Sequence, residues 1–272
     1  FDIFTTQKES EQISHHLYQS LADGENTGVQ GILKNHLSRV LDKLDRDDRP
    51  IAYQILELLV DSDKKRITQH QETLLQKLQY QQNEYSETSI NKVLQTLTNT
   101  RLLRVEKNRY ELIHDYLSEK IYLSTEIRDR KAVQELLERE LLTYQEVPDD
   151  LMHSETLKKV GLYRESLYLD ELRIIFILKS VIDVNLDLSN WLSYSPRNIV
   201  HYILEESLRS KKPEVRARAA HHLKEYYIPN VVPDLKELAL TDKSAEVRQE
   251  AVQTLETHVP DLALDILLTN LD

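Results

Sequence analysis

Residues 103–112 read LRVEKNRYEL, and this stretch decides the fold of the first half of the chain. Apolar residues before it recur every three or four positions, whereas here they alternate with charged ones. A period of two indicates a half-buried β-strand, and a period of 3.6 indicates an amphipathic helix. Lys107 and Asn108 interrupt the alternation with a possible turn. The stretch therefore predicts a two-stranded hairpin.

Three helical patterns lead into this hairpin. The first begins near Pro50, and the third lies between Ser86 and Thr100. Residues 68–71 read TQHQ, which predicts a capping box that opens the second. Each pattern has apolar residues spaced so that they lie on one face of a helix. They are Ala52, Ile55, Leu56 and Leu59 in the first; Leu74, Leu75 and Leu78 in the second; and Ile90, Val93, Leu94 and Leu97 in the third. Three helices followed by a hairpin predict a winged helix.

Further helices are expected on both sides of this region. One covers about residues 29–44 and places Ile32, His36, Val40 and Leu44 on one stripe, and another runs from His114 through roughly Arg128. Residues 1–27 form a polar N-terminal segment with a possible short helix around residues 13–21. Residues 128–190 carry helical patterns without a recognisable motif, with a break at Pro148, and are predicted to be a helical linker.

An internal repeat follows Trp191. The sequence PEVR at residues 213–216 returns as AEVR at residues 245–248, and VPDL at residues 232–235 returns at residues 259–262. Two alternating helix types at this spacing predict an α-solenoid. Arg216, Arg218 and Arg248 are expected to pair within or between repeats rather than to line a ligand surface. We therefore expect four segments: 1–27, a winged helix at 28–127, the linker at 128–190, and repeats at 191–272 that are truncated at the C-terminus.

The amino-acid composition excludes several classes of protein function. The chain has 272 residues, a net charge of −11, no cysteine and only four glycines. A P-loop or a dinucleotide-binding loop needs several closely spaced glycines, and this sequence supplies neither pattern. Helix-forming residues dominate, so the expected fold class is mostly α. No apolar run approaches the roughly twenty residues of a membrane span. A cytoplasmic protein is expected, and the absence of an initial methionine indicates a piece of a longer one.

The motifs resemble a known family. The residues GVQG at 28–31, the winged helix, and the run YELIHDYL at 110–117 resemble the winged-helix region of STAND signal-transduction NTPases, which include immune receptors and bacterial defence proteins. Ile113, His114 and Asp115 resemble the Met-His-Asp motif of that family, with isoleucine in place of methionine. Asp242, Val247, Arg248 and Ala251 are similar to the HEAT repeat pattern, whereas Ser210 stands where the preceding unit would have its aspartate.

The resemblance implies a regulatory role. In the family, the motif histidine bonds the β-phosphate of ADP held by a neighbouring ATPase domain, so His114 would make that contact in trans and Asp115 would orient the ring or the helix start. The implied partners are an upstream ATPase domain of the same parent chain and a protein ligand on the HEAT-like repeats. ATP or ADP would be bound by the parent protein, with no cofactor or metal held by these residues alone. In the alternative interpretation, His114 merely caps the helix and Asp115 favours its positive end.

The sequence also leaves other classes of function open. A winged-helix DNA-binding regulator with a HEAT-like interaction domain is one alternative, but residues 28–127 carry equal numbers of acidic and basic residues, and Lys92 is the only cation of the third helix. A plain scaffold is another. The sequence has no His-Glu-x-x-His motif and no glycine-flanked serine elbow, so no catalytic centre is expected in this chain.

Overall fold

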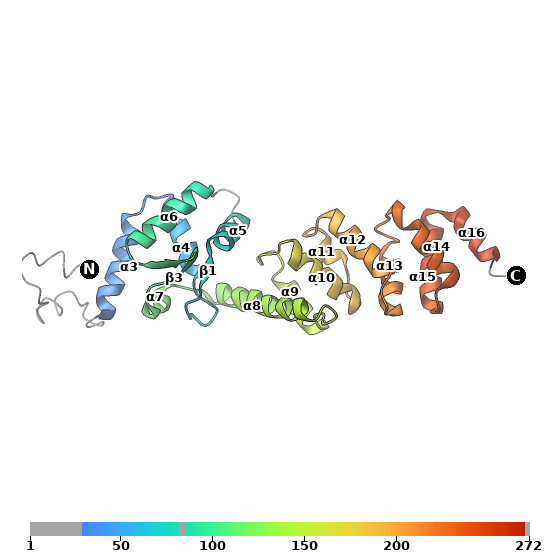
Figure 1. Cartoon of the computed structure of the whole chain (residues 1–272), viewed down its shortest axis with the longest axis horizontal. Coiled ribbons are helices and arrows are strands. Elements are labelled where there is room, and N and C mark those ends of the chain that lie inside the picture. Colours follow the sequence, from blue (N-terminus) through green and yellow to red (C-terminus); the bar gives the residue numbers. More distant parts are fainter. Residues whose placement is uncertain (1–28, 82–84, 270–272) are drawn as a thin grey trace, which may run out of the picture. The chain divides into compact units, whose positions relative to one another are not determined.

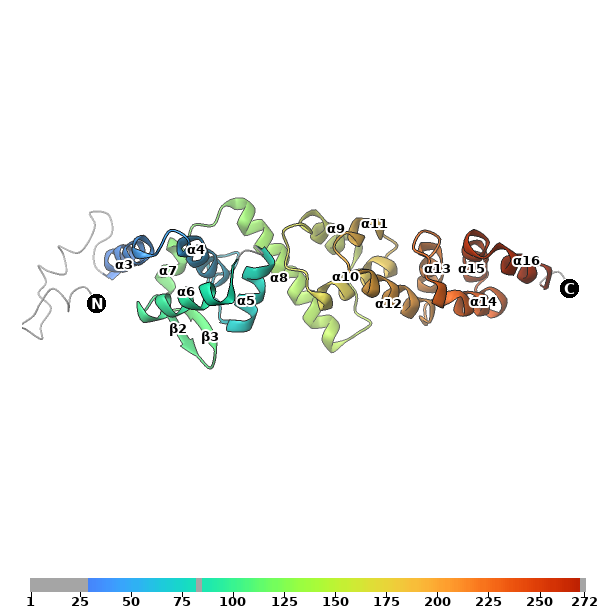
Figure 2. The same cartoon turned by 90° about the horizontal axis from the view of Figure 1, so that it is seen from above.

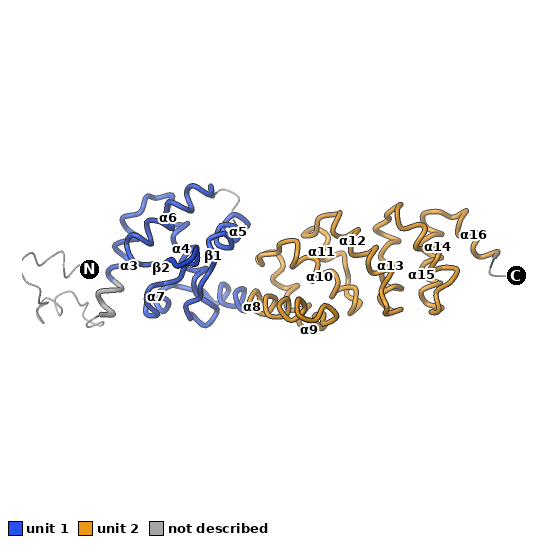
Figure 3. Tube along the Cα trace, viewed as in Figure 1, with its two compact units in different colours: residues 1–132 blue, residues 133–272 orange. Residues whose placement is uncertain are grey.

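The computed structural model describes residues 29–81 and 85–269, which form two compact units (Figure 1). The division falls between Ala132 and Val133, within helix α8 (Thr125–Glu146) (Figure 3). Each unit has its own apolar core. The described chain is mostly helical with one small sheet and ends in repeats, which confirms the predicted fold class. The short helix expected around residues 13–21 lies outside the described residues.

Unit 1 combines helices with a three-stranded sheet. Its elements are α3 (Val29–Lys43), α4 (Asp48–Leu58), β1 (Gln69–His70), α5 (Gln71–Gln81), α6 (Glu87–Asn99), β2 (Leu103–Glu106), β3 (Arg109–Leu112), α7 (Asp115–Lys120) and the first part of α8. The antiparallel sheet has the order β1-β3-β2, with Leu103 opposite Leu112 and Gln69 opposite Tyr110. From α4 onward, the order is helix, strand, helix, helix, strand, strand, so the three expected helices and the hairpin are present together with an edge strand, β1, that the sequence did not predict.

The expected apolar faces form the core of unit 1. Ala52, Ile55 and Leu59 of the first pattern are fully buried, and so are Ile90, Val93 and Leu97 of α6. The side chain of Ser86 caps α6 by accepting a hydrogen bond from the Ser89 amide at 3.1 Å. His36 Nε2 lies 2.7 Å from the Thr100 carbonyl oxygen, which ties α3 to the end of α6. The side chain of Ile32 lies outside the described part.

The predicted capping box at residues 68–71 is wrong. Gln69 and His70 form strand β1 on the edge of the sheet, and α5 begins only at Gln71. Thr68 Oγ1 donates a hydrogen bond to Glu111 Oε2 at 3.2 Å instead of capping a helix. Pairing with β3 satisfies backbone groups that the capping box would have served, and a pattern of local residues cannot reveal this long-range pairing.

The hairpin forms as predicted, but its tip leaves the core. Leu103 and Leu112 are buried at its base, whereas Val105 is 42% exposed. Lys107 and Asn108 both have positive φ, 49° and 60°, as in a type I′ turn. Figure 2 shows the hairpin extending beyond the neighbouring helices of unit 1. The alternation of apolar and charged residues therefore predicts the strands correctly, but it wrongly implies that the apolar residues near the hairpin tip are buried.

The helix expected from His114 through Arg128 is interrupted. Helix α7 ends at Lys120, and α8 begins at Thr125. Between them Ile121 and Leu123 are buried while Tyr122 is 82% exposed, an alternation that suits extended chain. Ser124 Oγ then accepts a hydrogen bond from the Ile127 amide at 3.2 Å, at the start of α8.

Unit 2 is entirely helical in its described residues. Its elements after α8 are α9 (Ser154–Leu162), α10 (Glu171–Asp183), α11 (Ser189–Leu192), α12 (Arg197–Leu208), α13 (Pro213–His222), η1 (Pro229–Val231), α14 (Val232–Thr241), α15 (Ala245–His258) and α16 (Pro260–Thr269). One apolar core runs from Val133 in α8 to Ile266 in α16. The segment predicted as a linker thus packs into the same core as the repeats. The predicted segment boundaries remain predictions.

The repeat arginines work inside the solenoid, as the sequence predicts. Arg216 grips Asp242 with two hydrogen bonds, from Nε to Oδ2 at 2.7 Å and from Nη2 to Oδ1 at 2.8 Å. Its Nη1 also donates to the Ser210 carbonyl at 2.8 Å, and Arg248 Nη1 makes the equivalent bond to the Asp242 carbonyl at 2.7 Å. Arg218 donates to the Ile182 and Asp183 carbonyls at the end of α10. The guanidinium groups of these arginines are therefore bonded within the repeats.

Candidate functional site

His114 lies where strand β3 passes into helix α7. It occupies the N-cap position of α7 in an extended conformation, with φ −135° and ψ 138°, but its side chain makes no capping hydrogen bond. The imidazole is exposed, and within residues 29–81 and 85–269 it has no hydrogen-bonding partner. The interpretation of His114 as a side-chain cap is therefore not realised. Its ring is free to contact a group outside the described chain.

Asp115, the next residue, is held in place by a long-range contact. Its Oδ1 lies 2.6 Å from Arg66 Nε. Arg66 Nη1 also donates to the Leu112 carbonyl at 3.2 Å, so one guanidinium joins the end of β3 to the first residue of α7. The carboxylate of Asp115 thus fixes the motif against Arg66, and no hydrogen bond joins it to the ring of His114. The structure brings both predicted site residues together at one chain junction.

Arg66 ends a loop that is itself firmly bonded. The Asp61 amide donates to the Lys65 carbonyl at 2.8 Å, and the Lys65 amide donates to Asp61 Oδ1 at 2.7 Å. Lys64 has a positive φ of 63°. Arg128 Nε donates to the Ser62 carbonyl at 3.2 Å, which anchors the loop to α8. An open pocket of about 610 Å³ is lined by Asp63, Lys64, Lys65, Arg66, Asp115, Ser118 and Glu119.

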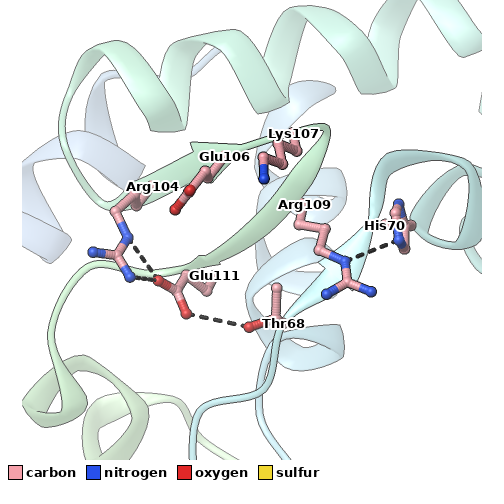
Figure 4. Close-up of a pocket in the computed structure, with 7 residues that line it drawn as sticks. All are labelled: Thr68, His70, Arg104, Glu106, Lys107, Arg109 and Glu111. Atoms are coloured by element: carbon pink, nitrogen blue, oxygen red, sulfur yellow. Dashed lines mark hydrogen bonds and ion pairs between the residues drawn. The ribbon is translucent and has the colours of Figure 1, made fainter.

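A second open pocket, of about 460 Å³, lies on the outer face of the hairpin and β1 (Figure 4). Arg104 Nε donates to Glu111 Oε1 at 2.7 Å, on the same carboxylate that Thr68 contacts. Although partial burial opposes the shift, the hydrogen bonds from Arg104 and Thr68 lower the pKa of Glu111 below its ordinary value. Arg109 Nε donates to His70 Nε2 at 2.9 Å. We call the residues lining this pocket, Thr68, His70, Arg104, Glu106, Lys107, Arg109 and Glu111, the wing face.

Helix α6 offers little to nucleic acid. Its only cation, Lys92, lies 3.0 Å from Asp45 Oδ2 and 2.7 Å from Asp48 Oδ2. The hydrogen bonds to these two carboxylates raise the pKa of Lys92 above its ordinary value. A helix that reads the major groove normally presents unpaired cations to the phosphates. The single lysine of α6 is instead paired with two carboxylates of the same unit.

Sequence reasoning missed Arg66 and the loop before it. The run KKR at residues 64–66 was visible as a charge cluster, but a sequence pattern does not show that it meets Asp115, which lies far along the chain. No group of three or more His, Cys, Asp or Glu residues in the described chain is arranged to hold a metal ion. Among the described helices, none has the length and apolar character needed to cross a membrane.

Two family models match parts of the chain. The family model for the Novel STAND NTPase 1 domain matches residues 2–150, and the model for HEAT repeats matches residues 202–272. A search of curated proteins finds no match, and a search of solved structures finds none either. The first match includes His114, Asp115 and Arg66, and the second begins within α12. Because the Novel STAND NTPase 1 model covers more than half of its residues, the chain belongs to this family.

Proposed function

We propose that this chain is a regulatory and sensor region of a signal-transduction NTPase, one that has a role in defence and acts in the cytoplasm. Unit 1 would serve as the winged-helix part that docks against the ATPase domain of the same parent protein. His114 would hold the β-phosphate of ADP bound there, and so would favour the resting state. The repeats of unit 2 would bind a protein ligand. Catalysis would belong to the ATPase domain rather than to the residues described here.

The free imidazole of His114 is the observation that carries this proposal. His114 is exposed and its ring has no partner in the described chain, and, unlike the exposed N-cap residue His153, it stands in the Ile113-His114-Asp115 run that resembles the family motif. Asp115 is already neutralised by Arg66, so it does not compete for the ring. An exposed imidazole N–H beside the first amides of α7 can face an anion. This arrangement suits a phosphate held in trans.

For binding at the repeats to change ADP retention, the protein ligand would have to bind one arrangement of the domains of the parent protein more tightly than the other. A ligand shifts an equilibrium only by the difference between its affinities for the two states. Repeat proteins offer extended surfaces for such partners. In unit 2 the two arginines of the repeat pattern, Arg216 and Arg248, make hydrogen bonds within the repeats, so ligand contacts would come from other, exposed positions.

The test uses the full-length parent protein. His114→Ala should release bound ADP faster, and raise basal activity, relative to the unaltered protein. His153→Ala is the matched control, because His153 is also an exposed N-cap residue whose side chain makes no capping bond. Unchanged ADP retention and basal activity in His114→Ala would contradict the latch. A gel-shift titration with mixed duplex DNA at low salt would separate this role from DNA binding, since salt-dependent binding of the duplex would favour the latter.

A further inference from the structure

The wing face carries two cations that make no ion pair with any described residue, although Glu106 lies opposite Arg109 in the β2–β3 register. Arg109 Nε donates to His70 Nε2, and no carboxylate of the described residues lies within ion-pair distance of Lys107 or Arg109. Arg104, by contrast, is paired with Glu111. Figure 4 shows Lys107 and Arg109 on the same side of this pocket, with His70 beside Arg109. The neutralised pair and the free cations occupy opposite ends of the face.

The backbone adds an independent observation at Lys107. Its φ of 49° is in the left-handed region, where a side chain other than that of Gly, Asn or Asp is uncommon. Holding a lysine there costs conformational free energy that an asparagine would largely avoid. The turn thus places a long cation at a position that a smaller residue would fill with less strain. The hydrogen bond to His70 similarly restrains Arg109 before any ligand arrives.

We propose that the wing face binds a compact phosphate-bearing ligand, of the di- or polyphosphate class, through Lys107 and Arg109. This site includes neither His114 nor Asp115 and goes beyond the function proposed above. Arg109 would give paired hydrogen bonds to phosphate oxygens, and Lys107 would add a point charge. Thr68 on the same face adds no donor, because its hydroxyl already donates to Glu111 Oε2. His70 is a positioning residue that holds the Arg109 guanidinium.

Charge on the neighbouring elements favours a compact ligand over nucleic acid. Glu106 on the same face has no ion-pair partner among the described residues, and Glu87 begins α6. A duplex needs several phosphate contacts spread along the protein surface. Two unpaired cations within one pocket match two adjacent phosphate groups better than an extended backbone.

Binding to the 272-residue chain can be followed by the shifts of its backbone amide NMR signals. Inorganic pyrophosphate and ADP should move the signals of residues 68–70 and 104–111, and adenosine should not. Arg109→Ala and Lys107→Asn should each weaken pyrophosphate at least tenfold, and Arg109→Lys should weaken it less than Arg109→Ala. Lys43→Ala, at an exposed lysine that ends α3, should leave the affinity unchanged. The same signals report that each variant is folded.

Several outcomes would overturn the proposal. One is the absence of pyrophosphate shifts at the wing face, and another is equal weakening by Lys43→Ala. Duplex DNA that shifts the same signals while pyrophosphate does not would assign the face to nucleic acid instead. His114→Ala keeps the two sites distinguishable, because it should leave pyrophosphate binding at the wing face intact whether or not it alters ADP retention in the parent protein.

Discussion

Arg66 Nε lies 2.6 Å from Asp115 Oδ1, so a loop before the sheet fixes the residue that follows His114. The two side chains are 35% and 81% exposed, and exposed ion pairs contribute about 0–1 kcal/mol. The contact is therefore of small value to stability. It matters for geometry, because Arg66 also holds the carbonyl of Leu112 at the end of β3.

Arg66→Ala should leave unit 1 folded while altering the surroundings of His114. We expect the free energy of unfolding to fall by at most about 1 kcal/mol, and the ring signals of His114 to shift in NMR spectra. Arg66→Lys should restore the charge but not both hydrogen bonds, and so should restore the ring signals only partly. Unmoved His114 signals in Arg66→Ala would show that the loop does not position the motif.

The Arg216–Asp242 pair should matter far more to stability. Their side chains are only 16% and 4% exposed, and Asp242 accepts two guanidinium hydrogen bonds. Asp242→Ala leaves a largely buried cation without its partner, so unfolding should become easier by about 2–3 kcal/mol. Asp234→Ala, which removes one of the two carboxylate partners of the exposed Arg209, is the control and should cost less than about 1 kcal/mol. Denaturant titration of both variants measures the difference.

Acid should remove the stability that the Arg216–Asp242 pair contributes. The hydrogen bonds from Arg216 hold the pKa of Asp242 below its ordinary value. Because the folded state binds this proton more weakly than the unfolded state, the contribution is complete above the unfolded pKa of about 4 and disappears as pH falls through the lower folded value. Stability measured from pH 7 down to pH 3 should therefore decline less steeply in Asp242→Ala than in the unaltered chain. Parallel curves would contradict the coupling.

His222 should make unit 2 weaker at mildly acidic pH. Its burial, together with the neighbouring charge of His221, lowers the pKa of His222. The unfolded chain then takes up the proton first, so stability falls as pH drops below about 6.5 towards the folded value. His222→Gln cannot be protonated and should flatten the stability curve in this window, whereas His153→Gln at an exposed position should not. Thermal unfolding at pH 7.5 and 5.5 compares them.

The hairpin turn should be stabilised by residues that tolerate positive φ. Lys107→Asn combined with Asn108→Gly produces the Asn-Gly pair preferred in type I′ turns, and we expect a gain of about 0.5–1 kcal/mol. Denaturant titration gives the gain in stability, and pyrophosphate titration should show that affinity falls at the same time. A loss of stability would show that the turn is not strained at Lys107.

Local periodicity predicted most helices because their apolar faces lie within single segments. The faces of α4 and α6 and the strands of the hairpin follow directly from spacing. Features that depend on distant partners could not be predicted. Strand β1 exists because Gln69 pairs with Tyr110, and the break after Lys120 exists because Ile121 and Leu123 both enter the core.

The residues of the candidate site also differ in whether the sequence alone could reveal them. His114 and Asp115 stood out because a short motif places them next to each other. Arg66 is separated from them by the helices α5 and α6 and by the three strands of the sheet, so only the fold reveals its contact. The free cations of the wing face were visible as Lys107 and Arg109, but His70 joined them only through β1.

The central claim is that His114 retains ADP in the resting parent protein. The most direct measurement is the dissociation rate of a fluorescent ADP analogue from the full-length protein and from its His114→Ala variant, with His153→Ala as control. We predict at least tenfold faster release for His114→Ala, equivalent to about 1.4 kcal/mol of lost interaction, and an unchanged rate for the control. Equal release rates for all three proteins would contradict the account.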